Sequence, residues 1–270
     1  MGHIKRDENG YSNTEDSSKF CVKSSPFNIA AALYQKGGIS LGLFNGLTPY
    51  LKGQEFKRAV GSFEENYEKI PHFSLMFATC MEAYVRSVSK ILPLVAKDVW
   101  TSIDTFADIG GGSGYMSIEL CKFYPALKAL SCDLQPLQPV FDTYMAKEDP
   151  ALAQRVTFRK VDFRNDDFPT EVQAILFGNM IHSWDDTVKH LLLKKAFEAL
   201  PSGGYVLFYE FFLDSGALDN YLMSLVIQCN GGGNQFTFKE AEGWLTEAGF
   251  INAEMRKIDD YYDVVIARKP

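Results

Sequence analysis

The stretch ADIGGGSGY, residues 107–115, decides the fold class that this 270-residue sequence predicts. It begins inside the apolar segment DTFADI, and a helical pattern that runs through Phe123 follows it. Glycine lets a backbone turn tightly and approach a ligand without a Cβ in the way. A glycine-rich turn between a strand and a helix is typical of a loop that binds a nucleotide, so we expect the first strand of an α/β sheet to end here.

Short apolar segments alternate with helical patterns from about residue 103 to the C-terminus. Alternation of this kind is typical of a parallel sheet with helices on both faces. A terminal hairpin is expected as well, which adds an antiparallel edge. The predicted fold class is therefore α/β: a Rossmann-like, doubly wound, mostly parallel seven-stranded sheet with a C-terminal antiparallel hairpin. The expected strands are 104–109, 128–133, 155–162, 174–179 and 205–212, the hairpin is 251–258 with 261–269, and the later helices are 136–148, 186–200 and 238–248.

The N-terminal part of the chain has a different character. Residues 1–25 are polar and contain no apolar signal core, so we expect a disordered arm and no secretion signal. Residues 26–100 carry mostly helical patterns, the last of which stops at Pro93. We therefore expect three parts: the arm, a small helical N-terminal region at 26–100 and the α/β domain at 101–270.

Composition excludes several classes of partner. The net charge is −7 and there is no long basic run, which makes nucleic acid an unsuitable partner. No apolar stretch reaches the roughly 18 residues that a membrane span needs. The five cysteines form no CxxC pair, and the four histidines have no ligand spacing with them, so we expect free thiols and no metal site. The sequence thus predicts a cytoplasmic protein with no membrane, nucleic acid or metal partner.

Several polar and aromatic residues lie just after predicted strands. In doubly wound sheets, ligands bind at the carboxyl ends of the strands, where the strand order reverses. These side chains should therefore share one cleft. They are Asp108 with the glycine loop, Asp133, Asp162 with Phe163, His182 with Trp184, and Glu210.

The glycine spacing indicates which nucleotide is bound. The glycines fall at alternate positions, Gly110, Gly112 and Gly114, and Asp108 precedes them by two residues. A dinucleotide site usually has G-x-G-x-x-G on a pyrophosphate, which a carboxylate at this place would repel. The carboxylate suits a cation instead, such as the amino group of a methionine moiety. A nucleotide-binding dehydrogenase is therefore a disfavoured alternative.

The next two strand ends complete the ligand. Asp133 is placed to accept hydrogen bonds from both ribose hydroxyls. Asp162 is placed to meet the adenine amino group, and Phe163 its face. An adenosine with a positively charged amino-acid tail is S-adenosylmethionine, and its product after methyl transfer is S-adenosylhomocysteine.

The motifs that follow one another along residues 70–268 resemble a known family. DIGGGSG, VDF, IHSWDD, GGYVLFYEFF and GGGNQFTFKEAEGWLTEAGF are similar to the motifs of the S-adenosylmethionine-dependent O-methyltransferases of the caffeate, hydroxyindole and bacterial small-molecule type. The chain departs from the family in three places. Ser183 stands where the family has an aspartate, Gln235 stands where it has a second acid near the histidine, and the N-terminal dimerisation region is shortened. A homodimer is left open.

The resemblance implies roles for the residues of the cleft. His182 would be the general base, Glu210 the acid that holds it, and Gln235 the third member of the catalytic group. The expected cofactor contacts are Asp108, Gly110, Gly112, Gly114, Asp133, Leu134, Asp162, Phe163, Asn179 and Trp184. The expected acceptor pocket consists of Phe73, Phe77, Met81, Met180, Phe211, Tyr221, Met223, Ile227 and Asn230. Asp185 and Asp186 are expected only to cap the next helix.

The predicted function is methyl transfer to a small-molecule acceptor, with O-methylation favoured. A hydroxyl with a pKa near 10 is a poor nucleophile until a base takes its proton, and a neutral imidazole can do so. Two alternatives stay open. One is S- or N-methyl transfer to a small acid or thioether that needs little help from a base, because Gln235 removes one negative charge. The other is a cofactor-binding family member that catalyses a different reaction.

Overall fold

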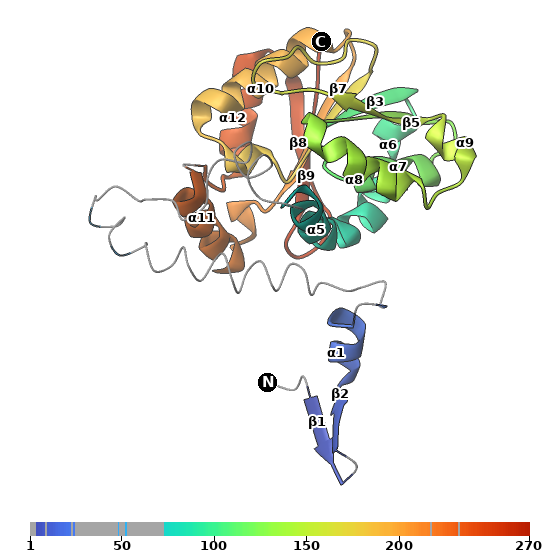
Figure 1. The fold of residues 1–270 in the computed structure, drawn as a ribbon. Helices are drawn as coiled ribbons and strands as arrows, with labels where there is room; N and C mark the ends of the chain where they lie inside the picture. Colours follow the sequence, from blue (N-terminus) through green and yellow to red (C-terminus); the bar gives the residue numbers. More distant parts are fainter. Residues whose placement is uncertain are drawn as a thin grey trace.

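The computed structural model describes residues 4–8, 10–22, 24, 48, 52, 73–216, 218–231 and 233–270. Its centre is a seven-stranded sheet of order β5-β4-β3-β6-β7-β9-β8 (Figure 1). The strands are β3 (Thr105–Ile109), β4 (Lys128–Asp133), β5 (Val156–Lys160), β6 (Ala174–Gly178), β7 (Tyr205–Glu210), β8 (Ile251–Lys257) and β9 (Asp263–Arg268).

The first five strands are parallel, and the hairpin β8–β9 is antiparallel to them through the pair β7–β9. The chain runs from β3 outward to β4 and β5, then returns to the other side of β3 for β6 and β7. The strand order therefore reverses between β3 and β6, which is where a doubly wound sheet opens a crevice for a ligand. The predicted fold class is confirmed.

Helices cover both faces of the sheet (Figure 1). Helices α5 and α7 pack against each other on one face of the sheet, and α10 and α12 pack against each other on the other face. The longer helices are α5 (Phe73–Val95), α7 (Tyr115–Phe123), α8 (Gln138–Met145), α10 (Asp186–Ala199), α11 (Leu218–Gly231) and α12 (Phe238–Ala248). The short ones are α6 (Lys97–Trp100), α9 (Pro150–Ala153), η2 (Gln135–Leu137), η3 (Ile181–Ser183) and η4 (Leu213–Ser215).

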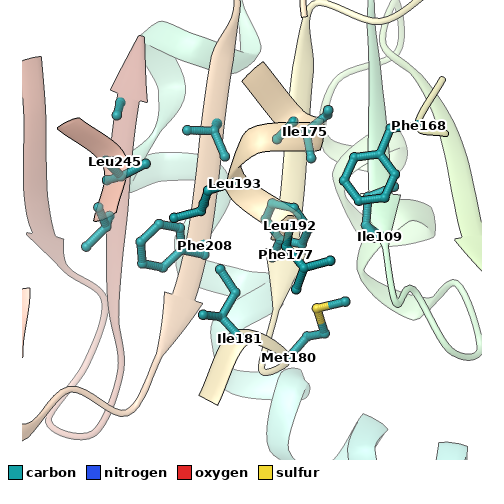
Figure 2. Packing of buried hydrophobic residues seen from close by; sticks show 14 of the residues in the cluster. Ile109, Phe168, Ile175, Phe177, Met180, Ile181, Leu192, Leu193, Phe208 and Leu245 are labelled. Atoms are coloured by element: carbon teal, nitrogen blue, oxygen red, sulfur yellow. The ribbon is translucent and has the colours of Figure 1, made fainter. Parts of the chain in front are cut away.

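Alternate residues of the central strands enter two separate cores. Ile175 and Phe177 of β6 pack toward α10 and α12, whereas Ala174 and Leu176 pack toward α5 and α7. This follows from the strand geometry, in which successive side chains point to opposite faces. Figure 2 shows the first core, with Phe208 of β7 beside Leu192 and Leu193 of α10, and with Met180 and Ile181 just past Phe177.

Helices α5 and α6 belong to the second core rather than to a separate unit. Val88, Leu92 and Ala96 are fully buried there, and the ring of Trp100 lies 5.3 Å from the ring of Phe106 in β3. The C-terminal half of α5 is thereby fixed against the sheet. The domain boundary at residue 100 stays a prediction, but the described part of the helical region shares the core of residues 101–270.

The N-terminal arm differs from what its composition predicts. Strands β1 (Ile4–Asp7) and β2 (Gly10–Asn13) form an antiparallel hairpin, and α1 (Glu15–Phe20) follows with Thr14 as its N-cap. Polar composition did not reveal this because a hairpin and a capped helix are held by backbone groups. Residues 26–72, apart from 48 and 52, lie outside the described residues, so the first part of the helical region stays a prediction.

Candidate active site

The glycine loop connects β3 to α7 at the point where the strand order reverses. Gly110, Gly112 and Gly114 have φ values of +76°, +59° and +74°, which residues with a Cβ rarely adopt. A Cβ at Gly114 would also lie 2.5 Å from the ring of Phe141. At Gly112, by contrast, no atom lies within 4 Å of the place a Cβ would take, because that place faces the open cavity.

The end of β4 is tied to this loop through Asp133. The backbone N–H of Gly112 donates to one carboxylate oxygen of Asp133 at 2.8 Å, and that of Leu134 donates to the other at 2.7 Å. Burial raises the pKa of Asp133 to about 6, although these two hydrogen bonds favour the charged form. The carboxylate is thus held at a fixed place on the rim of the cavity.

Asp108 lies deeper, within β3, and is 3% exposed. The hydroxyl of Ser117 donates to its carboxylate at 2.9 Å. Burial raises the pKa of Asp108 to about 7, and the nearby charge of Asp133 acts in the same direction. A buried carboxyl with a raised pKa that faces a cavity is a candidate partner for a cationic ligand.

One cavity joins these elements, with an empty volume of about 1010 Å³ when its open mouth is included. It lies at the carboxyl ends of β3, β4 and β6, and one face of α5 lies against it. Most of the predicted cofactor contacts line it, as do Phe77, Met81 and Met180 of the predicted acceptor pocket. The lining cofactor contacts are Asp108, Gly110, Gly112, Asp133, Leu134, Phe163, Asn179 and Trp184.

An aromatic pair closes the side of the cavity nearest β5. The rings of Phe163 and Trp184 meet edge to face with their centroids 5.0 Å apart, and the guanidinium of Arg164 lies over both rings. Asp162 does not line the cavity. Its carboxylate accepts hydrogen bonds from the backbone of Arg164 at 3.1 Å and the side chain of Asn165 at 2.7 Å, so it stabilises the turn that carries Phe163.

Glu210 at the end of β7 holds the turn that follows β6. It is fully buried, and one of its oxygens accepts hydrogen bonds from the backbone N–H groups of Met180 and Ile181 at 3.0 and 2.9 Å. Its other oxygen lies 2.5 Å from Nδ1 of His182. This pairing fixes the ring orientation and places the proton of a neutral imidazole on Nδ1, which leaves Nε2 as the basic nitrogen.

Gln235 does not bond the histidine. It is 2% exposed, and neither atom of its side-chain amide has a hydrogen-bond partner. Only its backbone N–H is engaged, with the hydroxyl of Ser224 at 3.2 Å. No hydrogen bond between Gln235 and His182 is therefore present in the described part of the chain. The segment that contains Gln235 still touches the turn of residues 181–184, which carries His182, since a Cβ at Gly233 would lie 2.2 Å from the carbonyl oxygen of His182.

The other predicted acceptor residues whose side chains the structure describes do not line the cavity. Phe73 stacks on Phe77, and Phe211 packs on Tyr262 with their centroids 4.1 Å apart. On α11, Ile227 is buried, whereas Tyr221 is 49% exposed. Helical spacing alone could not tell which side of α11 faces the site. Met223 is half-buried and does not line the cavity either, and the side chain of Asn230 lies outside the described residues.

Tyr209, Tyr115 and Glu82 are among the cavity residues that the sequence did not predict. Tyr209 lies over Gly178, where a Cβ would be 2.2 Å from the tyrosine hydroxyl, and nothing in an apolar strand marks such a residue. Tyr115 opens α7 directly after the glycine loop and also lines the cavity. Glu82 is buried on α5, where Arg86 donates to it at 2.7 Å and the hydroxyl of Tyr144 also donates to it. A glutamate in the apolar stripe of a helix, four residues before an arginine, was a usable signal for Glu82.

Asn179 is a strained residue at the rim. Its φ of +51° is unusual for a residue with a side chain, and such strain gathers at functional sites. Its side-chain N–H donates to the hydroxyl of Tyr262 at 2.7 Å, while its buried side-chain oxygen has no partner. This leaves a hydrogen-bond acceptor beside the cavity that Asn179 lines.

Fold and site together define a nucleotide-binding α/β enzyme, and comparison with known proteins places it further. Residues 47–251 match the model of the O-methyltransferase domain, and the chain belongs to this family. It is a methyltransferase that uses S-adenosylmethionine. Within the residues that the structure describes, no group of three or more His, Cys, Asp or Glu side chains could hold a metal ion, and no helix is long and apolar enough to cross a membrane.

Individual relatives agree with this assignment. Acetylserotonin O-methyltransferase of Bos taurus is 28% identical over 278 residues, which are 96% of this chain and 76% of that protein. L-tyrosine C(3)-methyltransferase of Streptomyces lavendulae is 28% identical, over 79% of this chain and 60% of that protein. The crystal structure of human N-acetylserotonin methyltransferase with S-adenosylmethionine superposes with a TM-score of 0.86 at 23% identity, over 99% of this chain and 79% of that one.

The cavity fits S-adenosylmethionine. Asp108 offers a buried carboxylate for the ammonium group, and Asp133 offers a fixed carboxylate for the ribose hydroxyls. The open space at Gly112 lets the ligand approach the backbone, and Phe163 offers an aromatic surface to the adenine.

Replacing Gly112 with alanine tests the approach of the ligand to the loop. A Cβ there enters the cavity, so we expect the dissociation constant for S-adenosylmethionine to rise at least about tenfold, because close backbone approach is what the glycine permits. The left-handed φ alone costs about 1–2 kcal/mol of stability. Gly216→Ala is the matched control, since Gly216 has φ +65° and open surroundings outside the cavity lining. Titration calorimetry and urea unfolding separate the two effects, and equal affinity for the two variants would contradict the assignment.

Binding of S-adenosylmethionine should weaken as the pH falls. The ammonium group requires Asp108 in its charged form, which is present above its pKa of about 7 and is lost below it. We expect the dissociation constant at pH 6 to be about tenfold higher than at pH 8, since one proton competes with the ligand. Calorimetry across this range measures the slope. Asp108→Asn should bind weakly and show a flatter profile, whereas a constant wild-type affinity would refute the role of Asp108.

Proposed function

We propose that this enzyme methylates a hydroxyl group of a small molecule, with His182 as the general base. The observation that carries the proposal is the contact of 2.5 Å between Nδ1 of His182 and the buried carboxylate of Glu210. A hydroxyl acceptor needs such a base, whereas a thioether has no proton to lose. The fixed pair therefore favours O-methylation over S-methylation.

The chain has three tasks in the proposed mechanism. S-adenosylmethionine supplies an electrophilic methyl group when bound. Asp108, Asp133 and Phe163 hold it by its ammonium, ribose and adenine, and Trp184 supports Phe163. Phe77, Met81 and Met180 form the apolar wall against which the acceptor lies, and they exclude water from a step in which opposite charges cancel.

His182 moves the proton. With Nδ1–H donated to Glu210, the lone pair on Nε2 would accept the hydroxyl proton. The methyl group would then pass from the sulfur of S-adenosylmethionine to the acceptor oxygen, and S-adenosylhomocysteine would leave. The charge of Glu210 stabilises the imidazolium that results, and the hydrogen bonds from Met180 and Ile181 keep the carboxylate in place. Gln235 makes no hydrogen bond to His182 in the described structure, so we propose no part for it in this proton transfer.

The setting of the enzyme is also proposed. The four cysteines that the structure describes are free, three of them buried, which supports work in a reducing compartment such as the cytoplasm. A homodimer remains a proposal that rests on the resemblance of the sequence to its family.

Substitution of His182 tests the base. We expect His182→Ala to lower turnover by about 10²–10⁴-fold, which is the usual worth of general-base catalysis, with cofactor affinity unchanged. Release of S-adenosylhomocysteine from a panel of phenols and other hydroxyl compounds measures it. His190→Ala is the matched control, because His190 on α10 also faces a glutamate but its side chain is 42% exposed and does not line the cavity. Wild-type turnover by His182→Ala would point instead to an acceptor that needs no base.

Glu210→Gln tests the tautomer. A glutamine keeps an oxygen for the backbone N–H groups, but its amide N–H donates to Nδ1 and moves the imidazole proton to Nε2. We expect a loss of turnover comparable to that of His182→Ala, since the basic nitrogen is then blocked. A loss of less than about threefold would exclude Glu210 from this role.

A further inference from the structure

Helix α10 carries two lysines that bind two different loops of the site. Lys189 and Lys195 are six residues apart, which places them about 9 Å apart along the helix and about 120° apart around it. They therefore leave the helix toward different neighbours. Neither residue touches the cavity, and neither was singled out by the sequence.

Lys195 holds the loop on the adenine side. Its ammonium donates to the backbone carbonyls of Phe163, Arg164 and Asp166 at 2.9, 3.0 and 2.8 Å. Three carbonyls that converge on one cation fix the path of the backbone. This is the loop whose Phe163 lines the cavity and packs on Trp184.

Lys189 holds the segment behind the catalytic turn, residues 233–236. Its side chain is completely buried, and its ammonium donates to the side-chain oxygen of Asn234 at 2.6 Å and to Asp186 at 3.2 Å. It also lies over the rings of Phe236 and Trp244, at 5.5 and 4.8 Å from their centroids. A buried ammonium is costly unless it is well paired. Here Asn234 and Phe236 of one short segment supply two of its contacts, beside those to Asp186 and Trp244.

That segment is in direct contact with the turn of His182. Gly233 leaves no room for a Cβ beside the carbonyl groups of His182 and Ser183. Two further hydrogen bonds hold the segment, from the N–H of Gln235 to Ser224 and from the N–H of Leu213 to the carbonyl of Phe236. A shift of Asn234 would therefore be transmitted to the backbone of the catalytic turn.

We propose that α10 positions the two halves of the active site independently, with Lys195 as the positioning residue of the cofactor loop and Lys189 as that of the segment behind His182. The assignment of the segment behind His182 to the acceptor side of the active site rests on the proposed function. The two contacts have different partners, so loss of one should leave the other intact.

Hydrogen exchange tests this division without any methyl transfer. The full-length protein carrying Lys189→Met, with S-adenosylhomocysteine bound, should exchange the amides of residues 181–184 and 233–236 at least about tenfold faster than wild type, and those of 163–166 at the wild-type rate. Lys195→Met should show the reverse pattern. Faster exchange in both regions in both variants, or no change in either, would overturn the proposal.

Affinity and kinetics provide a second, separate readout. Lys195→Met should raise the dissociation constant for S-adenosylmethionine at least about tenfold, whereas Lys189→Met should change it less than about threefold. With a naphthol as acceptor, Lys189→Met should lower kcat/KM for the naphthol about tenfold or more and leave KM for the cofactor unchanged. Lys189→Arg keeps the positive charge and should recover kcat/KM. Equal effects of the two methionine variants on cofactor affinity would overturn the division.

Failure of the proposed function can be told apart from failure of the lysine proposal. If wild type turns over no hydroxyl compound, the proposed function fails, while hydrogen exchange and cofactor affinity still decide the roles of the two lysines. Asn234→Ala removes the contact of Lys189 from the other side, and it serves when Lys189→Met does not fold. Wild-type exchange of residues 181–184 in Asn234→Ala would refute the coupling to the catalytic turn.

Discussion

The buried carboxylate of Glu210 is the constraint on which the active site depends. It ends a strand that is covered on both faces, where an isolated charge is very costly. Three neighbours offset that cost: the N–H groups of Met180 and Ile181 and the ring of His182. The same contacts that make the charge tolerable also set the conformation of the turn after β6. The contacts that orient the ring of His182 are therefore the same contacts that stabilise the buried end of β7.

The rest of the site is arranged around the reversal of strand order between β3 and β6. The glycine loop and Asp133 lie on one side of this point, and the turn of His182 lies on the other. Helix α5 lines the cavity beyond the carboxyl ends of the strands, and its Glu82 accepts hydrogen bonds from Arg86 and Tyr144. Because α5 is also packed into the core through Val88 and Leu92, the lining of the cavity is connected to the interior of the protein.

The sequence was sufficient for the sheet, because strand–helix alternation and the glycine loop are local patterns. It also placed Asp108, Asp133 and His182 at one edge, since strand ends in a parallel sheet converge. The extents of the strands were less accurate: β6 ends at Gly178 rather than 179, because Asn179 turns out of the strand. Lys189 owes its role to partners on other elements, such as Asn234 and Trp244, and the amide of Gln235 is buried without a hydrogen-bond partner in the described structure. Such long-range contacts leave no trace in periodicity or spacing.

The two aspartates of the cavity affect the stability of the folded protein as well as the binding of the ligand. Asp108 and Asp133 have pKa values of about 7 and 6 in the folded chain, against an ordinary value near 4 in an unfolded one. Each holds its proton more tightly when folded, so ionising them at neutral pH weakens the fold, and a bound cation relieves part of that penalty. A ligand that binds only the folded state protects it from unfolding and proteolysis by mass action. Bound S-adenosylmethionine should therefore make the folded chain more resistant to unfolding and proteolysis at neutral pH.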